Sequence, residues 1–195
     1  GIDDCVASYQ WLLGQGYGAE QIIIAGDSAG GGLAMATALR IREQKSPSPA
    51  GLVLLSPWVD LTLANRPHCN DGIDPMLRWS NLAAGVESYL PGVDPSDPLA
   101  SAVFADLAEL SPMLIQVGSE EILLSDAKRL KERADAHGVP VTMTVFDKAW
   151  HVFQLQAGIY DQANTAIDEI ARFVATVRNS QIINMSSVPV TVAEH

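Results

Sequence analysis

The stretch IIIAGDSAGGGLA, residues 22–34, decides the fold and the chemistry that the sequence predicts. A short β-branched run leads into the pattern G-x-S-x-G, and an alanine-rich segment follows, which is typical of a strand that turns sharply into a helix. Such a turn holds its serine in a strained conformation at the carboxyl end of the strand, with no room for a Cβ atom at Gly26 or Gly30. The pattern therefore predicts Ser28 as a nucleophile, with the backbone N–H of Ala29 directed at the oxyanion that its attack would form.

Apolar strands alternate with amphipathic helices along the chain, which is the pattern of a mostly parallel sheet flanked by helices. The expected strands are 21–25, 52–55, 113–117 and 141–146, and the expected helices are 3–14, 29–44, 79–90, 122–137 and 161–178. Because the first strand is a continuous apolar run, we expect it to be buried on both faces. The proline-rich connection 57–111 is long, and such connections are more often functional than idle.

The composition narrows the kinds of partner. Twelve basic and 23 acidic residues give a formal net charge of −11, which argues against nucleic acid, because phosphate binding needs clustered lysine and arginine. No apolar run approaches the ~20 residues that span a bilayer. Cys5 and Cys69 fit no metal or redox spacing, so we expect free thiols in a reducing cytoplasm and no metal or other cofactor, although a disulfide between them stays open.

Two other functions of a glycine-rich turn are tested by its spacing. Dinucleotide binding needs G-x-G-x-x-G, whereas this turn reads G-D-S-A-G-G-G. A phosphate-binding P-loop needs glycine, lysine and then serine or threonine, and no such triplet follows the turn. Both alternatives fail, and the nucleophile remains the better interpretation.

A serine hydroxyl becomes a strong nucleophile only when a histidine takes its proton and a carboxylate orients that histidine. The sequence contains four histidines. His137 stands at a helix end, where a capping role is expected, and His195 ends the chain. His68 comes before any acid that could follow the serine. His151, in the loop after a predicted strand, is therefore the candidate base.

The acid that would orient the histidine has three candidates. In hydrolases built on such a turn the chain order is serine, acid, histidine, which places the acid in VGSEEILLSDA at 117–127. Glu120 and Glu121 lie just past a predicted strand, and Asp126 lies on the helix that follows. Each could instead be a solvated acid near a helix N-terminus, and the composition does not choose between the two glutamates.

Seven stretches carry a family resemblance: DDCVASYQWLL (3–13), IIIAGDSAGGGLA (22–34), LLSPWVDLT (54–62), DPMLRW (74–79), DPSDPLASAVFADL (94–107), LIQVGSEEILLSDAKRLKERADAHGV (114–139) and HVF (151–153). They resemble the bacterial hormone-sensitive-lipase-like esterases, a family of α/β-hydrolases. That family's acid lies thirty residues before its histidine, in a D/E-x-L motif, which here is Glu121-Ile122-Leu123. The resemblance thus implies a triad of Ser28, Glu121 and His151.

The resemblance also implies the architecture and the reaction. It implies the C-terminal part of an α/β-hydrolase fold over residues 1–178. Residues 179–195 show no periodicity, and we interpret them as a tail. It implies a carboxylic-ester hydrolase that acts through an acyl-enzyme on short-chain acyl esters, because the family's capped pocket is small. Dimerisation through about 141–178 follows from the same resemblance. The family's upstream H-G-G-G segment and N-terminal cap do not occur in these 195 residues, so we expect part of an esterase.

Trp58, Met76, Trp79 and Phe153 are candidate pocket residues, and an ordinary core position is an equal alternative for each. Trp150 departs from the family by placing a bulky indole beside the histidine. Two other functions stay open, a non-catalytic ligand-binding homologue and an amidase or peptidase that uses the same triad. The presence of the histidine argues against the first, because the receptors on this fold lose it.

Overall fold

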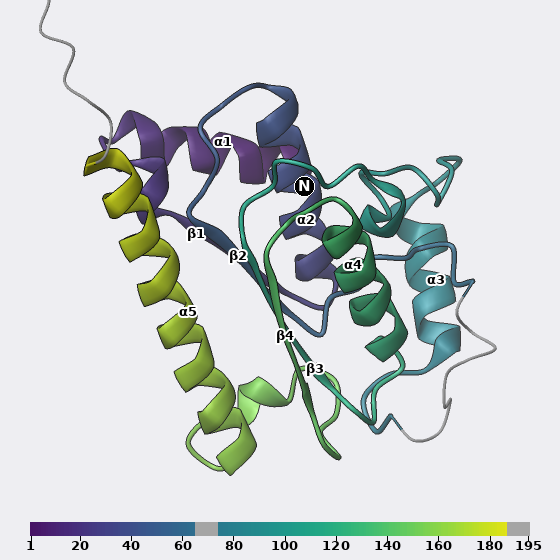
Figure 1. Cartoon of the computed structure of the whole chain (residues 1–195). Helices are drawn as coiled ribbons and strands as arrows, with labels where there is room; N and C mark the ends of the chain where they lie inside the picture. The colour runs from purple at the N-terminus through teal and green to yellow at the C-terminus, as the bar shows by residue number, and fades with distance from the viewer. Residues whose placement is uncertain (65–73, 187–195) are drawn as a thin grey trace, which may run out of the picture.

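A computed structural model describes the backbone of residues 1–64 and 74–186 and the side chains of 1–64 and 74–179. A parallel sheet contains β1 (Ile23–Asp27), β2 (Gly51–Leu55), β3 (Met113–Gly118) and β4 (Val141–Phe146), in the order β1-β2-β3-β4. The predicted α/β fold, with a parallel sheet between helices, is confirmed (Figure 1).

The strand order determines where the helices lie. Crossovers between parallel strands are right-handed, so strands that follow one another in chain order carry their connecting helices on one face. These helices are α2 (Ala29–Glu43), α3 (Trp79–Tyr89) and α4 (Leu124–Ala136). Figure 1 shows α5 (Asp161–Ser186), which follows the last strand, on the opposite side of the sheet from α2 and α4. The first helix, α1 (Ile2–Gly14), packs against α2.

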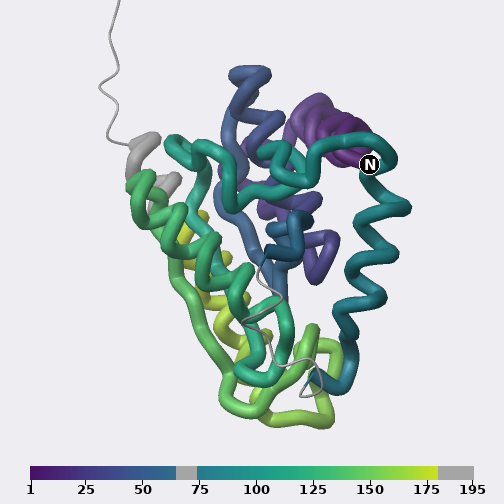
Figure 2. The backbone as a smooth tube through the Cα atoms, turned by 90° about the vertical axis from the view of Figure 1, so that its right-hand side faces the viewer, coloured from purple at the N-terminus to yellow at the C-terminus, as the bar shows by residue number. Residues whose placement is uncertain are grey.

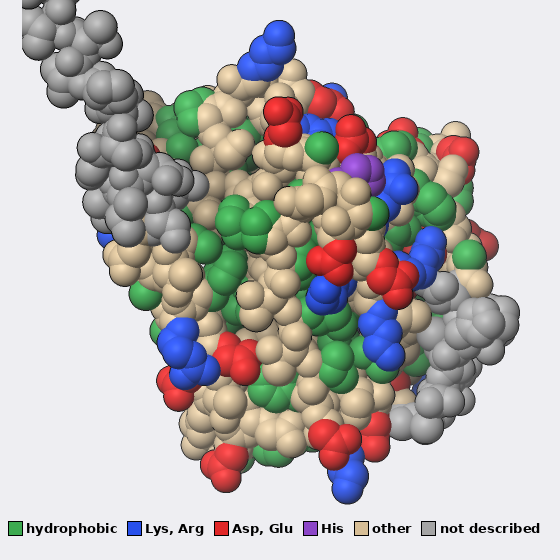
Figure 3. Space-filling model, in the orientation of Figure 1, with side chains coloured by type: hydrophobic (Ala, Val, Ile, Leu, Met, Phe, Trp, Pro, Cys, Tyr) green, Lys and Arg blue, Asp and Glu red, His purple; other side chains and the backbone are tan. Residues whose placement is uncertain are grey.

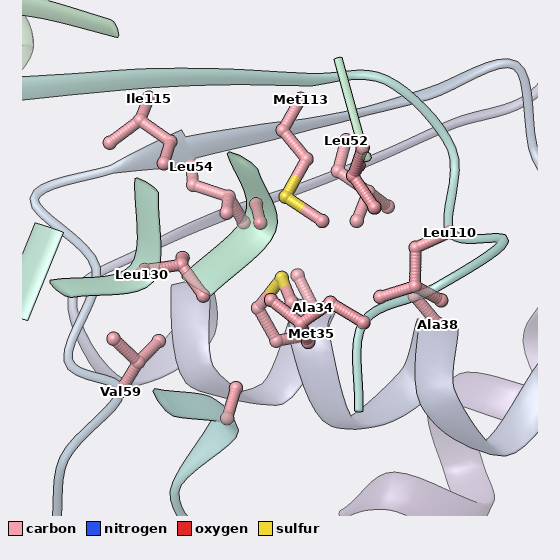
Figure 4. Packing of buried hydrophobic residues seen from close by; sticks show 14 of the residues in the cluster. Ala34, Met35, Ala38, Leu52, Leu54, Val59, Leu110, Met113, Ile115 and Leu130 are labelled. Carbon is pink, nitrogen blue, oxygen red and sulfur yellow. The ribbon is translucent and has the colours of Figure 1, made fainter. Parts of the chain in front are cut away.

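The largest hydrophobic cluster lies between the sheet and the layer of α2 and α4 (Figure 4). Its members include Met35 and Ala38 of α2, Leu52 and Leu54 of β2, Met113 and Ile115 of β3, and Leu130 of α4. Alternate strand residues face this layer, as a period of two requires. Burying each leucine or methionine contributes roughly 1.5–3 kcal/mol, and this cluster therefore fixes the strand ends that carry the loops of the site.

The first strand differs from its prediction in position and in burial. β1 begins at Ile23, two residues later than expected, because Ala19–Gln21 form a short 3-10 turn. Ala25 and Asp27 are exposed, so the expectation of a strand buried on both faces is wrong. The reason is the strand's place at the edge of the described sheet, where it pairs with β2 alone.

The last helix is longer than predicted. α5 continues to Ser186, eight residues beyond the expected end at 178. No glycine or proline occurs between Asn179 and Ser186, so the local sequence contains no helix breaker there. The expected end of the helix at 178 is therefore wrong, because 179–186 continue it, and 187–195 lie outside the described residues.

The surface drawn in Figure 3 carries basic and acidic side chains interspersed with one another. None of the helices within 1–64 and 74–186 is long and apolar enough to cross a bilayer. Cys5 is half-buried, and Cys69 lies outside the described residues, so a bridge between them stays untested.

Candidate active site

Ser28 occupies the sharp turn between β1 and α2, with φ 52° and ψ −122°. Backbone strain of this kind costs about 1–3 kcal/mol and persists only where the surroundings enforce it. Two hydrogen bonds do so here: the Ser28 N–H donates to the Leu55 carbonyl at 2.9 Å, and the Trp58 N–H donates to the Ser28 carbonyl at 2.9 Å. The strained turn predicted from the sequence is confirmed, and the end of β2 together with the chain directly after it holds the turn from both sides.

The two motif glycines differ in the space around them. A Cβ atom at Gly26 would overlap the carbonyl group of Gly30 and lie 2.8 Å from the Gly31 nitrogen, so the predicted lack of room is confirmed there. At Gly30 the nearest atom to an added Cβ would be Asp27 Oδ1 at 3.9 Å, so the prediction is wrong at that position. The physical reason is that the Cβ position of Gly30 has no other atom of the described residues within contact distance, whereas that of Gly26 lies against the first turn of α2.

Glu121 and His151 meet through a short hydrogen bond. The distance between Glu121 Oε2 and His151 Nδ1 is 2.7 Å, and both side chains are buried. The other carboxylate oxygen, Oε1, accepts the Gly118 N–H at 2.8 Å. A buried carboxylate needs such partners, because an unpaired charge away from water is costly. With the proton of the neutral imidazole on Nδ1, the Nε2 atom is left as a hydrogen-bond acceptor.

The loops that carry these two side chains are tied together. The Glu120 N–H donates to the Ala149 carbonyl at 3.0 Å, and the Lys148 N–H donates to Ser119 Oγ at 2.7 Å. The backbones come so close that a Cβ atom at Gly118 would overlap the Ala149 carbonyl group. A glycine at the end of β3 is therefore a requirement of the contact between the loops.

The other two acid candidates lie elsewhere. Glu120 is exposed to solvent. Asp126 is buried, and its Oδ2 accepts the backbone N–H groups of Val59 at 3.1 Å and Asp60 at 2.9 Å. Asp126 thus fixes the chain that follows β2, and of the three candidates the structure brings Glu121 to His151.

Asp74 is a buried carboxylate that the sequence interpretation missed. Its Oδ1 accepts the N–H groups of Met76 at 2.8 Å and Leu77 at 3.0 Å, and its Oδ2 accepts the Ile122 N–H at 3.1 Å. The first pair forms a turn of the kind that an aspartate before a proline favours, which is the signal that the sequence offered. The third bond crosses to the residue after Glu121 and could not be foreseen from local pattern.

An apolar cavity of about 360 Å³ lies beside the nucleophile turn. It is lined by Ala29, Gly30, Gly32, Leu33, Trp58, Leu61, Gly85, Tyr89, Leu99 and Ala100. Two of these residues belong to α3, which Figure 2 shows along one edge of the molecule. As the first residue of α2, Ala29 has a backbone N–H without an acceptor inside the helix, and this N–H lies at the positive end of the helix dipole.

Of the four residues expected in the pocket, the structure brings Trp58 to the cavity. Met76 is 55% exposed. Trp79, the first residue of α3, is buried in a hydrophobic cluster against which Trp58 packs. Phe153 is fully buried beneath the histidine loop and packs on Phe146, with 4.7 Å between ring centroids. These three residues do not line the cavity. Trp79 and Phe153 pack in the interior, and Met76 lies at the surface.

The indole of Trp150, next to the histidine, stacks on Tyr160. The ring centroids are 5.3 Å apart and the rings are inclined by 21°. Tyr160 also contacts Phe153 edge to face, at 6.3 Å. The bulky side chain that departs from the family pattern is therefore accommodated against the residues that precede α5.

The remaining histidines are placed as follows. His137 caps the C-terminal end of α4, as predicted, and its Nδ1 lies 2.9 Å from the Arg133 carbonyl oxygen. His68 and His195 lie outside the described residues. Within the described part of the chain, no group of three or more histidine, cysteine, aspartate or glutamate side chains could hold a metal ion.

Comparison with known proteins gives independent evidence for the fold and the family. Residues 1–155 match the family described as alpha/beta hydrolase fold. The chain is 40% identical over 178 residues to an esterase of Acinetobacter venetianus, and the match covers 90% of this chain and 59% of that protein. It is 39% identical over 176 residues to an acetyl-hydrolase of Streptomyces hygroscopicus, again over 90% of this chain and 59% of the relative.

The structural comparison agrees. The crystal structure of a hormone-sensitive lipase from a metagenome library matches with a TM-score of 0.87 and 46% identity, over 90% of this chain and 61% of that one. The chain thus spans 59% of the length of each of the two sequence relatives. It belongs to the α/β-hydrolase fold family, and the similarity to hormone-sensitive-lipase-like esterases that its sequence led us to expect is confirmed.

Proposed function

We propose that this chain carries the catalytic residues of a carboxylic-ester hydrolase, with Ser28 as nucleophile, His151 as general base and Glu121 as the orienting acid. The observation that carries the proposal is the buried 2.7 Å hydrogen bond between Glu121 and His151. A carboxylate in this position selects the tautomer and the orientation of the imidazole and stabilises the imidazolium that forms during catalysis. The strained turn at Ser28 is the second support.

In the first half of the reaction, His151 Nε2 takes the proton of the Ser28 hydroxyl as Oγ attacks the ester carbonyl carbon. The resulting oxyanion is stabilised by the Ala29 N–H at the start of α2. The imidazolium then donates its proton to the departing alkoxide, which leaves as an alcohol, and the acyl group stays on Ser28.

In the second half, His151 removes a proton from water, and the hydroxide formed attacks the acyl-enzyme. The attack forms a second tetrahedral intermediate. When it collapses, the bond to Ser28 Oγ breaks, the carboxylic acid is released, and His151 returns the proton to Ser28. Glu121 stays ionised throughout and forms no bond to the substrate.

The cavity supports the proposed substrate class. Its volume of about 360 Å³ is near the lower end of the ~300–1,000 Å³ typical of ligand sites. Its lining is apolar and includes Ala29, the residue next to Ser28. An acyl chain attached to Ser28 could therefore bind in an apolar cavity. We infer short-chain acyl esters, and the Streptomyces relative is itself named an acetyl-hydrolase.

Covalent labelling with a fluorophosphonate tests the proposal, because an assembled serine nucleophile and base react with it quickly. We expect Ser28→Ala to abolish labelling and the hydrolysis of p-nitrophenyl butyrate. Ser8→Ala, on the exposed side of α1, is the matched control and should change neither. Full labelling of Ser28→Ala would overturn the assignment.

Comparisons of substrates separate the related functions. A faster reaction with butyrate than with long-chain esters supports the short-chain preference, and faster cleavage of an equivalent amide would favour an amidase or peptidase. A chain that binds esters in the cavity but is not labelled would be a ligand-binding homologue. Dimerisation through 141–178 and a cytoplasmic location stay predictions, which chromatography at defined concentration and cell fractionation test.

A further inference from the structure

Residues 55–58, which form the end of β2 and the chain directly after it, touch both sides of the site. The Leu55 carbonyl accepts the Ser28 N–H, and the Trp58 N–H donates to the Ser28 carbonyl, each at 2.9 Å. Between these two residues lies Ser56, whose Oγ accepts the Val152 N–H at 3.0 Å. One stretch of four residues is thus bonded both to the nucleophile and to the residue directly after the histidine.

The bond from Val152 to Ser56 lies at a strained and buried position. Val152 has φ 50° and ψ 40°, a left-handed conformation that β-branched residues rarely adopt. Ser56 is fully buried, has φ 47° and is held from its own side by the hydrogen bond from its N–H to the Gln116 carbonyl at 2.7 Å. Strained residues persist only where neighbouring structure over-determines them, and they cluster at functional sites.

We propose that Ser56 is a positioning residue of the active site, whose hydroxyl oxygen holds the Val152 N–H and thereby fixes His151 relative to Ser28. The proposal rests on the proposed function, since His151 and Ser28 are its base and nucleophile. Ser56 touches neither the substrate nor the reacting atoms in this role. It acts through the backbone of the histidine loop.

The geometry gives the hydroxyl a specific effect. Glu121 fixes the imidazole through Nδ1 alone, so rotation of the whole histidine loop about that bond would move Nε2 away from the nucleophile. The Val152 N–H is buried and needs an acceptor. If the oxygen of Ser56 is removed, the loop must shift to satisfy this N–H, and a shift of ~1 Å at a reacting group can cost on the order of 100-fold in rate.

The test compares Ser56→Ala, Ser56→Gly and a matched control, Ser111→Ala. Glycine removes the same oxygen but tolerates a φ of 47°, so it separates the loss of the hydroxyl from the backbone strain that alanine would retain. Ser111 is also buried, and its Oγ donates to the Pro49 carbonyl at 2.6 Å, just before β3 and at the end of the sheet remote from the site. The melting temperature of each variant is recorded beside the readouts below.

Two readouts follow the site itself. The first is the rate constant for labelling by a fluorophosphonate, which we expect to fall about 10- to 100-fold in both Ser56 variants and less than twofold in Ser111→Ala. The second is the low-field proton resonance of His151 Nδ1, together with hydrogen exchange at the Val152 amide. We expect this resonance to broaden or shift, and the exchange to accelerate, in the Ser56 variants alone.

Three results would overturn the positioning role. They are unchanged labelling and resonance in both Ser56 variants, a rate in Ser56→Gly equal to that of the unaltered chain, or equal losses in Ser111→Ala. If the unaltered chain is not labelled at all, the proposed function fails, whereas the resonance and the Val152 exchange still decide whether Ser56 fixes the histidine loop.

Discussion

Replacing Gly26 by alanine should destabilise the fold, whereas the same replacement at Gly30 should not. The G-x-S-x-G motif contains a glycine at both positions, but the atoms around the two glycines differ. At Gly26 the added Cβ would overlap the Gly30 carbonyl group and lie 2.8 Å from the Gly31 nitrogen. At Gly30 it would meet only Asp27 Oδ1, at 3.9 Å, which is an ordinary van der Waals contact.

The magnitudes follow from which atoms would have to move. Overpacking a core costs typically 1–3 kcal/mol, and we expect about 3 kcal/mol at Gly26, because backbone atoms cannot rotate out of the way. At Gly30 there is no clash, and alanine is the better helix former by up to about 1 kcal/mol. At ~2–4 °C per kcal/mol for a chain of this size, Gly26→Ala should melt about 6–12 °C lower and Gly30→Ala up to about 4 °C higher.

Urea titration followed by far-ultraviolet circular dichroism measures both effects. The urea concentration at the midpoint of unfolding should fall for Gly26→Ala and stay or rise for Gly30→Ala. The dependence of the unfolding free energy on urea concentration should not change, since a change would mean that the unfolded or the native state exposes a different surface area. Equal losses at the two positions would refute the reasoning from Cβ contacts.

Three further predictions concern buried polar groups. Glu121→Gln keeps the shape of the acid but offers no second carboxylate oxygen, and should lower the labelling rate by about 100- to 10,000-fold, whereas the exposed Glu120→Gln should change it less than twofold. Asp126→Ala leaves two buried N–H groups without that acceptor, and calorimetry should show a loss of about 3 kcal/mol or more. Burial, with a smaller contribution from Glu20, raises the pKa of Tyr9 to about 12. Because the unfolded value is near 10, this contribution to stability is complete below about pH 10 and is lost as the pH rises through about 12. Tyr9→Phe should therefore flatten the alkaline fall in stability, which urea titrations at about pH 9 to 12 would detect.

The order of elements could be predicted because it depends on local pattern. The expected strand at 141–146 and the alanine-rich helix after Ser28 each carry a local signal, and their observed bounds are Val141–Phe146 and Ala29–Glu43. The errors lie where a neighbour matters. β1 is less buried than its isoleucines predict because it stands at the edge of the described sheet.

The residues of the site also differ in how far the sequence predicts them. Residue types and chain order led to Ser28 and His151, but left three carboxylates, and only the family resemblance selected Glu121. The contact between Glu121 and His151 joins residues thirty positions apart, through loops that parallel strands bring to one edge of the sheet. No periodicity encodes such a distance.

By itself, the sequence determined the strand-turn-helix at 22–34 and the parallel α/β class, because each depends on residues close together in the chain. It also determined the family, through motifs that can be read directly along residues 3–153. Only the tertiary structure showed that Glu121, the acid implied by the resemblance, contacts the histidine. It alone decided which glycine of the motif has no room and which residues line the cavity. The physical reason is that each depends on the three-dimensional path of the backbone, which places atoms together that no periodicity in the sequence relates. The Ser56 hydroxyl, 96 residues from the Val152 N–H that it accepts, is the clearest example.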